Sequence, residues 1–205
     1  PYNGRDHRQV ATVVKMKPHV RILGIDDAPF SFADKEVLVV GSVVRLPNYL
    51  DGVMRTTIDV DGTNSTSKLS SMLNSSRFKD QIELVMLDGI ALGGFNVVDL
   101  EKVAKETGIP VCTVTRDEPN MDSIQDALRK KFKDWRRRWS LIEKTALFKI
   151  ETEHKPIYVS HVGITLEDLK PLIKKSTVRG ALPEPIRIAH LIASAMKTGE
   201  SYGRA

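Results

Sequence analysis

Hydrophobic residues between positions 21 and 60 fall into three short runs, each of which predicts a β-strand. Arg21–Asp26 is an apolar run closed by acids, and Val37–Leu46 is rich in β-branched residues and stops at a proline. Val53–Val60 alternates apolar with polar positions and ends at an Asp-Gly turn. Because only short connections separate the three runs, they favour an antiparallel meander.

The period of the pattern changes after residue 62, where helices begin to alternate with strands. Leu69, Met72 and Leu73 have the spacing of one face of a helix that reaches about residue 76. Further apolar runs predict strands over 82–87 and 110–115, a helix that ends at Gly108, and a long helix over 122–144. The predicted order is therefore three antiparallel strands followed by two parallel crossover units.

The last part of the chain, residues 145–205, predicts a smaller α+β extension. Its expected elements are two short strands and two helices, at Ala146–Ile150, Ile157–Val162, 166–174 and from Pro185 onward. A chain of 205 residues is long enough to bury one core. We therefore expect a single domain over residues 1–205, with an N-terminal arm at 1–18 and an extension that packs on the same core.

Acidic residues end three of the predicted strands: Asp26 with Asp27, Asp61, and Asp88. Functional groups of open α/β sheets collect at the carboxyl ends of strands. Asp61 and Asp88 precede glycine, and Asp-Gly is also ordinary turn chemistry, so both interpretations stay open for these two residues. Asp26 and Asp27 differ, because adjacent carboxylates at a buried strand end repel each other unless a cation lies beside them.

Grouped carboxylates predict a hard cation as the ligand. Mg²⁺ and Mn²⁺ prefer oxygen ligands and bridge to substrate phosphates. Zinc is a poor candidate, because Cys112 is the only cysteine and the histidines are scattered. His161 and His190 lie in apolar patterns that favour packing over ligation. An acid on the first strand and another at the end of the fourth are typical of the ribonuclease H-like fold, in which carboxylate-held metal ions support phosphodiester cleavage.

The predicted long helix carries a dense basic segment at residues 129–139. Its aromatic residues lie on an apolar stripe with helical spacing, which indicates packing rather than base stacking. Its cations lie on the opposite face and indicate a phosphate partner, although a solvated face is the commoner outcome of a charge run. The cations expected to contact nucleic acid are Arg129, Lys130, Lys133, Arg136 and Arg137.

A glycine loop follows Asp88 and is expected to form a wall of the site. Gly93 and Gly94 would let the backbone approach a ligand closely, and the helix beyond Asn96 favours anions at its N-terminus, so Gly93, Gly94 and Asn96 are expected to contact a phosphate of the nucleic acid. The loop lacks the Lys-[Ser/Thr] pair of a P-loop, and a flexible turn is the alternative. Arg116 ends a third strand, where it would contact a phosphate or pair with its neighbour Asp117.

The charge distribution also indicates an anionic partner. The net charge is +5, and the first 120 residues carry 14 Lys and Arg against 16 Asp and Glu, while the rest carry 17 against 10. This asymmetry suits nucleic acid, a nucleotide or an anionic lipid. No apolar run approaches the roughly 18–20 residues that span a bilayer. No segment resembles a signal peptide, so we expect a reduced, cytoplasmic protein with neither a membrane nor a disulfide-linked partner.

Longer motifs resemble a known family. They are Leu23–Phe30 (LGIDDAPF), Leu87–Leu100 (LDGIALGGFNVVDL), Gly108–Arg116 (GIPVCTVTR) and the closing RGALPEPIRIAHLIA and GESYGRA. These segments are similar to an uncharacterised archaeal family, domain of unknown function number ninety-nine, over nearly the whole chain from about His19. That family in turn resembles endonuclease V, which uses a divalent metal to nick nucleic acid near deaminated adenine.

The resemblance to endonuclease V implies metal ligands in this chain. Asp26 in GIDDA matches the metal-binding aspartate of the family's first strand, and Asp88 in LDG matches the aspartate of its V-D-G motif. The family's catalytic glutamate has no evident match. Asp61 would lie in nearby space, so Asp61 and Asp27 are the expected additional ligands.

Other family positions depart from the pattern. Gly94 stands where the family has a histidine, and Arg116 replaces a lysine, which keeps a cation but changes its geometry. The wedge that displaces the damaged base is missing, apart from a faint similarity at Leu46–Gly52. The resemblance therefore supports a metal site without supporting specificity for inosine.

The sequence thus predicts an endonuclease V-like protein that binds DNA or RNA and hydrolyses phosphodiesters with Mg²⁺ or Mn²⁺. The expected catalytic residues are Asp26, Asp61, Asp88 and Arg116, and the expected metal ligands are Asp26, Asp27, Asp61 and Asp88. Two alternatives stay open: a binding module that kept the nuclease fold without catalysis, and a hydrolase of small phosphoesters.

Overall fold

Three antiparallel strands open the fold, as the hydrophobic pattern predicts. The structure is a computed structural model that describes residues 19–201, so the arm expected at 1–18 lies outside the described residues. Strand β1 (Arg21–Asp27) pairs with β2 (Glu36–Arg45), which pairs with β3 (Tyr49–Asp59). The apolar alternation places their buried residues on the sheet faces.

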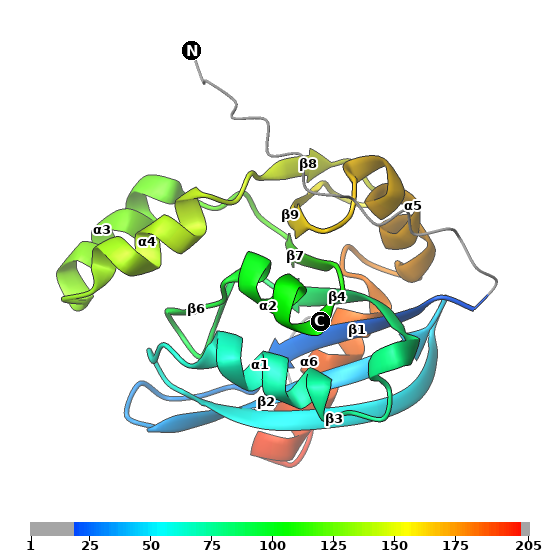
Figure 1. Ribbon diagram of the computed structural model, residues 1–205, viewed down its shortest axis with the longest axis horizontal. Coiled ribbons are helices and arrows are strands. Elements are labelled where there is room, and N and C mark those ends of the chain that lie inside the picture. Colours follow the sequence, from blue (N-terminus) through cyan, green and yellow to red (C-terminus); the bar gives the residue numbers. More distant parts are fainter. Residues whose placement is uncertain (1–18, 202–205) are drawn as a thin grey trace.

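Two parallel strands then extend the sheet on the other side of β1. Strand β4 (Ile82–Asp88) pairs with β1, and β7 (Val111–Thr115) pairs with β4, both in parallel. The crossover helices are α1 (Ser65–Asn74) and α2 (Leu100–Thr107), and a short 3-10 turn, η1 (Lys79–Gln81), precedes β4. The parallel arrangement brings the carboxyl ends of β1, β4 and β7 to one edge of the sheet (Figure 1).

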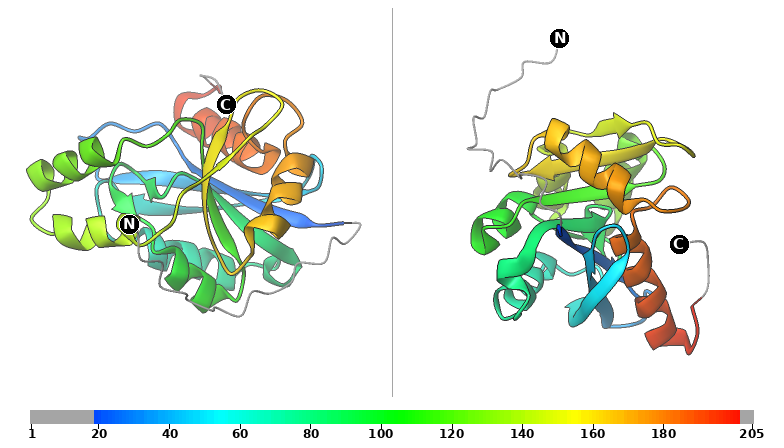
Figure 2. Two further views of the ribbon diagram at one scale, coloured as in Figure 1. Left: turned by 90° about the horizontal axis from the view of Figure 1, so that it is seen from above. Right: turned by 90° about the vertical axis from the view of Figure 1, so that its right-hand side faces the viewer.

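The C-terminal elements complete the same sheet. Strands β8 (Phe148–Ile150) and β9 (Ile157–Val162) are antiparallel and give the sheet order β3-β2-β1-β4-β7-β9-β8. Helices α5 (Leu166–Ser176) and α6 (Glu184–Thr198) lie on the face opposite α1 and α2 (Figure 2). Successive residues of β4 therefore point into two separate apolar clusters, one on each face.

Helix α6 packs directly on the backbone of β1. The Ser42 hydroxyl donates a hydrogen bond of 2.6 Å to the Pro185 carbonyl. A side chain at Gly24 would collide with the same Pro185 carbonyl group. This close approach of backbones fixes the first turn of α6 against the sheet and places the rest of the helix near the end of β1.

The predicted long helix is in fact two helices, so that prediction was wrong. Helix α3 (Met121–Lys131) ends at Phe132, whose φ of −126° and ψ of 131° are extended, and α4 (Trp135–Glu143) begins after Asp134. One continuous helix would stack many like charges at adjacent turns. The break instead leaves three cations in the last turn of α3, where the helix dipole favours them. The two helices form an arm, α3–α4, that projects from the edge where β1 and β4 end (Figure 1).

A small hairpin was not predicted. Strands β5 (Ala91–Leu92) and β6 (Asn96–Val97) pair around Gly93 and Gly94, whose φ angles of 55° and 86° are positive. Two-residue strands carry no readable hydrophobic period.

None of the helices within residues 19–201 combines the length and the apolar composition that a membrane span requires.

Candidate functional site

A buried carboxylate, Asp26, and a half-buried one, Asp88, lie close together where β1 and β4 end. Burial and the negative charge of Asp26 raise the pKa of Asp88 to about 6, while the positive charges of Arg116 and His190 act to lower it. Asp88 is thus an electrostatic neighbour of all three side chains. The structure brings together Asp26, Asp88 and Arg116 from three different strand ends.

Asp26 is held in place by two hydrogen bonds. It is only 5% exposed. Its Oδ2 lies 2.8 Å from Nδ1 of His190, and its Oδ1 accepts a hydrogen bond of 2.8 Å from the backbone N–H of Asp27. His190 comes from α6, and its apolar sequence pattern favours a core or surface role over ligation. Its contact with Asp26 depends on how α6 lies across β1, which no local pattern reveals.

Asp27 connects the site to the glycine hairpin. Its Oδ2 accepts a hydrogen bond of 2.8 Å from the backbone N–H of Gly93. Burial, followed by the charge of Asp26, raises the pKa of Asp27 to about 7. Asp26, Asp27 and Asp88 therefore crowd negative charge into a region that water solvates poorly, a condition that a cation would relieve.

Asp61 makes a different set of contacts. Its Oδ1 accepts a hydrogen bond of 2.8 Å from the Phe95 N–H, its own N–H donates to the Gly93 carbonyl at 2.8 Å, and Lys131 Nζ lies 3.6 Å from its Oδ2. A side chain at Gly94 would collide with Asp61 Oδ1. Asp61 is not among the charges that shift the pKa of Asp88. The contacts of Asp61 are therefore those of a residue that holds the hairpin in place. None of these contacts is with Asp26 or Asp88.

Asn96 also has a structural place. It is fully buried, its Oδ1 accepts from the Ser65 N–H at 2.9 Å, and its Nδ2 donates to the Asp59 carbonyl and to Asn64 Oδ1, each at 2.9 Å. The expectation that Asn96 contacts a phosphate is thus wrong, because its amide is already engaged inside the protein. Gly93 and Gly94, in contrast, line the turn next to Asp27 and Asp61.

The donor set determines which metal would fit. Among residues 19–201, no three His, Cys, Asp or Glu side chains converge as a ready-made metal site. Zinc does not fit, because its sites use three or four protein ligands, usually including Cys or His. Mg²⁺ and Mn²⁺ do fit the Asp26–Asp88 pair, because Mg²⁺ is commonly held by one or two carboxylates together with water and substrate phosphates.

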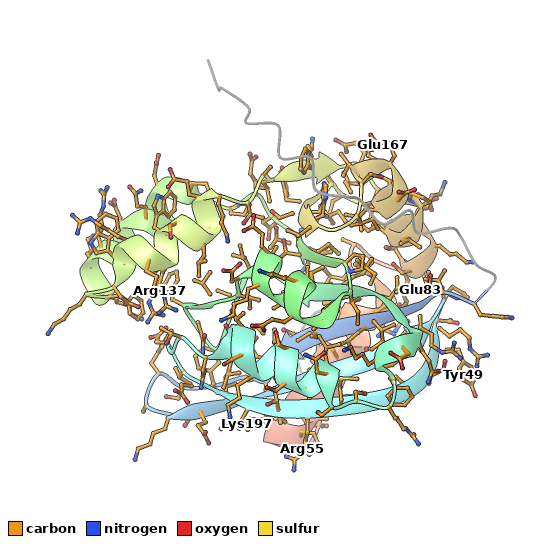
Figure 3. The ribbon with its side chains drawn as sticks, in the orientation of Figure 1. Tyr49, Arg55, Glu83, Arg137, Glu167 and Lys197 are labelled. Atoms are coloured by element: carbon orange, nitrogen blue, oxygen red, sulfur yellow. The ribbon has the colours of Figure 1, made fainter. Side chains whose placement is uncertain are left out.

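The α3–α4 arm presents the predicted cations to solvent. All five are exposed: Arg129, Lys130, Lys133, Arg136 and Arg137. Figure 3 shows Arg137 on the arm side of the molecule. The apolar stripe packs in a small third cluster around Leu128 and Ile142, in which Trp135 and Trp139 are only partly buried. The arm therefore has a packed inner side and a basic outer side.

One cation of the arm is buried, which the sequence analysis did not foresee. Arg138 is 7% exposed and its Nη1 donates to the carbonyls of Gly62 and Phe95, at 2.8 and 2.7 Å. Its Nε donates to Asp134 Oδ1 at 3.0 Å. Arg138 thereby ties the arm to the Asp61 turn and to the glycine hairpin.

The segment Leu46–Gly52 lies at the other end of the sheet. Arg45, just before it, pairs in register with Arg21 at the start of β1, whereas Asp26 pairs with Val40. Tyr49 is accordingly far from Arg137 in Figure 3. The faint similarity of this segment to a wedge therefore has no structural support, because the segment does not lie beside the carboxylates.

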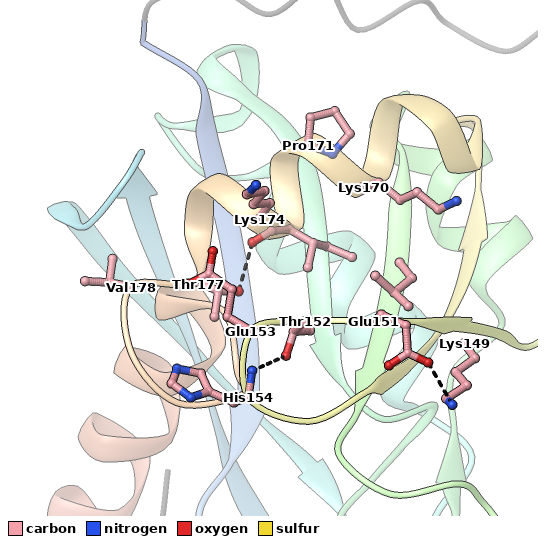
Figure 4. A pocket seen from close by; sticks show the side chains of 12 residues that line it. Lys149, Glu151, Thr152, Glu153, His154, Lys170, Pro171, Lys174, Thr177 and Val178 are labelled. Carbon is pink, nitrogen blue, oxygen red and sulfur yellow. Dashed lines mark hydrogen bonds and ion pairs between the residues drawn. The ribbon is translucent and has the colours of Figure 1, made fainter.

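A cavity of about 660 Å³ lies between the β8–β9 hairpin and α5 (Figure 4). Its lining includes Lys149, His154, Lys170 and Lys174, and none of the Asp26, Asp88, Arg116 and His190 side chains. Near it, His161 stacks on Phe148 with ring centroids 5.1 Å apart, and burial lowers the pKa of His161. This histidine has the packing role that the sequence predicts.

Comparison with known proteins gives the chain close relatives. A UPF0215 protein of Methanothermobacter thermautotrophicus is 43% identical over 192 residues, which cover 93% of this chain and 94% of the relative. The crystal structure of a protein of unknown function from Archaeoglobus fulgidus is 39% identical with a TM-score of 0.79, and the match covers 90% of this chain and 99% of that one. These relatives show that the chain is similar to uncharacterised archaeal proteins over nearly its whole length.

Endonuclease V shares the fold at low sequence identity. The structure of Ciona intestinalis endonuclease V in complex with a DNA containing an inosine is 14% identical with a TM-score of 0.54, and the match covers 84% of this chain and 83% of that one. The family model described as Endonuclease dU matches residues 18–197, from just before β1 to the last turn of α6. That span includes every residue of the site, and the chain belongs to the Endonuclease dU family.

Proposed function

We propose that the protein is a nuclease that hydrolyses phosphodiester bonds of nucleic acid with Mg²⁺ or Mn²⁺. The observation that carries this proposal is the pair of the buried Asp26 and the half-buried Asp88 beside Arg116 and His190, at the edge from which the basic arm projects. The description of the family and the endonuclease V fold support the same reaction class.

Each residue of the site would have a distinct role. Asp26 and Asp88 would hold the cation, and Asp27 is the nearest additional carboxylate. A bound cation supplies charge stabilisation at the scissile phosphate and lowers the pKa of an attacking water. His190 orients Asp26 through their 2.8 Å contact, and Arg116 brings a guanidinium to the position where a phosphate would approach.

The arm would bind the nucleic-acid backbone away from the reacting phosphate. Its five exposed cations contribute affinity through phosphate contacts, which are independent of sequence and sensitive to salt. Asp27, Asp61 and Arg138 hold the hairpin and the adjoining turn between the arm and the carboxylates.

A cleavage assay tests the proposal. Purified protein would be incubated with Mn²⁺ and end-labelled single-stranded and duplex DNA and RNA. The DNA would be unmodified or would carry a deoxyuridine, after the family description, or an inosine, after the structural neighbour. We expect cleavage of at least one substrate by the wild type, none after Asp88→Asn, and unchanged cleavage after Asp80→Asn, an exposed acid on η1 that serves as matched control. Cleavage that survives Asp88→Asn would refute the assigned chemistry.

A non-catalytic binding module is the second candidate. It is favoured by the absence of three converging metal-binding side chains within residues 19–201. It predicts salt-sensitive binding to nucleic acid with no turnover in any metal. The third alternative, a hydrolase of small phosphoesters, gains no support from the 660 Å³ cavity, because the carboxylates do not line it.

A further inference from the structure

An exposed aromatic ring stands next to the glycine hairpin. Phe32 lies in the loop between β1 and β2 and is 67% exposed. A Cβ at Gly94 would lie 3.4 Å from Phe32 Cε1, so the ring borders the same hairpin that Asp27 holds. Single exposed aromatic rings are common on protein surfaces, but a ring that borders a candidate site offers a face on which a ligand can pack.

The ring is supported by its neighbours. Phe30 packs against it edge to face, with centroids 5.5 Å apart and an interplanar angle of 84°. Lys131 Nζ, from the arm, lies 4.0 Å from the Phe32 centroid and also 3.6 Å from Asp61 Oδ2. Phe32 thus combines a largely exposed aromatic ring with a neighbouring cation of the arm, the pairing that proteins use to bind single strands.

We propose that Phe32 stacks on an unpaired nucleobase of the strand that the arm binds. This inference rests on the proposed function and names its substrate class: a single strand or a locally opened duplex. Bases inside an intact duplex already have both faces stacked, so they offer no surface to Phe32. A splayed base presents a free π-face, and stacking tolerates any base identity.

Tyr49 provides a matched comparison within the same chain. It is 61% exposed, and Arg45 lies over its ring at 4.5 Å from the centroid. Asp51 binds both Arg45, at 3.1 Å, and Arg21, at 2.6 Å, just as Asp61 pairs with Lys131 beside Phe32. Tyr49, however, lies at the end of the sheet away from the arm (Figure 3). Tyr49 is therefore an exposed aromatic residue that would not contact the nucleic acid held by the arm.

The test measures binding without cleavage, in EDTA. The probe is a single-stranded DNA that carries the fluorescent base 2-aminopurine, whose emission falls on stacking, and the Kd is measured by anisotropy. We expect Phe32→Ala to weaken binding about tenfold and to abolish the emission change on binding, the size of one stacked base. Phe32→Trp should retain both properties, Phe32→Leu should lose the emission change, and Tyr49→Ala should match the wild type.

Each remaining outcome decides the proposal. A fully paired duplex should bind all five proteins within about twofold, since only the phosphate contacts remain. If Phe32→Ala binds the single strand and changes its emission like the wild type, the stacking proposal is overturned and the proposed function stands. If the wild type binds no nucleic acid at low salt, both fail together. Thermal unfolding of Phe32→Ala should match the wild type, because the ring is exposed.

Discussion

The chain contains two Asp-Gly pairs at strand ends, and their surroundings differ completely. Asp61 follows β3, at the edge of the sheet, and its contacts hold a turn and a hairpin. Asp88 ends β4, between two parallel strands, and is half-buried beside Asp26. The same dipeptide therefore stabilises a turn at Asp61. At Asp88 it places a carboxylate beside a second negative charge. The position of the strand in the sheet decides between them, because only parallel neighbours bring several carboxyl ends together.

The largest difference is expected in cleavage. Asp88→Asn should lower kcat by more than the about 10–100-fold that outer-shell partners of a metal typically cost. Asp61→Asn should stay near the wild type, because asparagine keeps the acceptor for Phe95 and tolerates the positive φ of 52°. Cleavage rates of both variants measured in Mn²⁺ test this prediction. Equal losses of kcat would show that the two aspartates do not differ in their roles.

The partners of the two acids should also separate. His190→Ala removes the contact to Asp26 and should reduce kcat about 10–100-fold, as for a residue that orients a metal ligand. Arg138→Met leaves the Gly62 and Phe95 carbonyls without their donor and should lower the free energy of unfolding by about 2–3 kcal/mol. Denaturant unfolding and initial rates, measured on both variants, test this assignment. A reversed pattern would assign His190 to stability and Arg138 to catalysis.

Stability should change in opposite directions at the two acids. Asp88→Asn should raise the free energy of unfolding at pH 7 by about 1–2 kcal/mol, because it removes a half-buried charge next to Asp26. Asp61→Ala should lower it by about 1–3 kcal/mol, through the lost acceptor and the left-handed backbone. Chemical denaturation without metal gives both free energies of unfolding. A lower value for Asp88→Asn than for the wild type would show that the charge of Asp88 does not destabilise the folded protein.

The pH dependence sharpens the result for Asp88. Its folded pKa of about 6 is higher than its ordinary value of 3.8, so the folded state binds the proton more tightly. The advantage of Asp88→Asn over the wild type should therefore be full above about pH 6, shrink as the pH falls, and vanish below 3.8. Unfolding of both proteins across this range checks the slope, and a constant difference would show that charge is not its cause.

The order of the strands could be predicted from the sequence, because apolar runs, prolines and Asp-Gly turns are local signals. The meeting of Asp26 with Asp88 followed from the parallel crossover. The break at Phe132 could not be predicted, because one apolar stripe continues through both helices of the arm. The contact of His190 with Asp26 could not be predicted either, since it depends on the packing of α6 against β1.

Asp61 and Asn96 show a second limit. Both contact the β5–β6 hairpin or belong to it, and strands of two residues leave no pattern. Their polar side chains therefore resembled ligands, while the structure engages them with backbone groups. The structural role of Arg138 could not be predicted for a similar reason. It lies in a segment of many cations, and only the structure shows that this one is buried and bound to backbone carbonyls.

Mn²⁺-dependent thermal unfolding examines whether Asp26 and Asp88 form a cation site. Ligands that bind only the folded state raise the Tm. Saturating Mn²⁺ should raise the Tm of the wild type and of Asp61→Asn by equal amounts and leave that of Asp88→Asn unchanged. A rise in Asp88→Asn as large as in the wild type, or no rise in the wild type, would contradict the account.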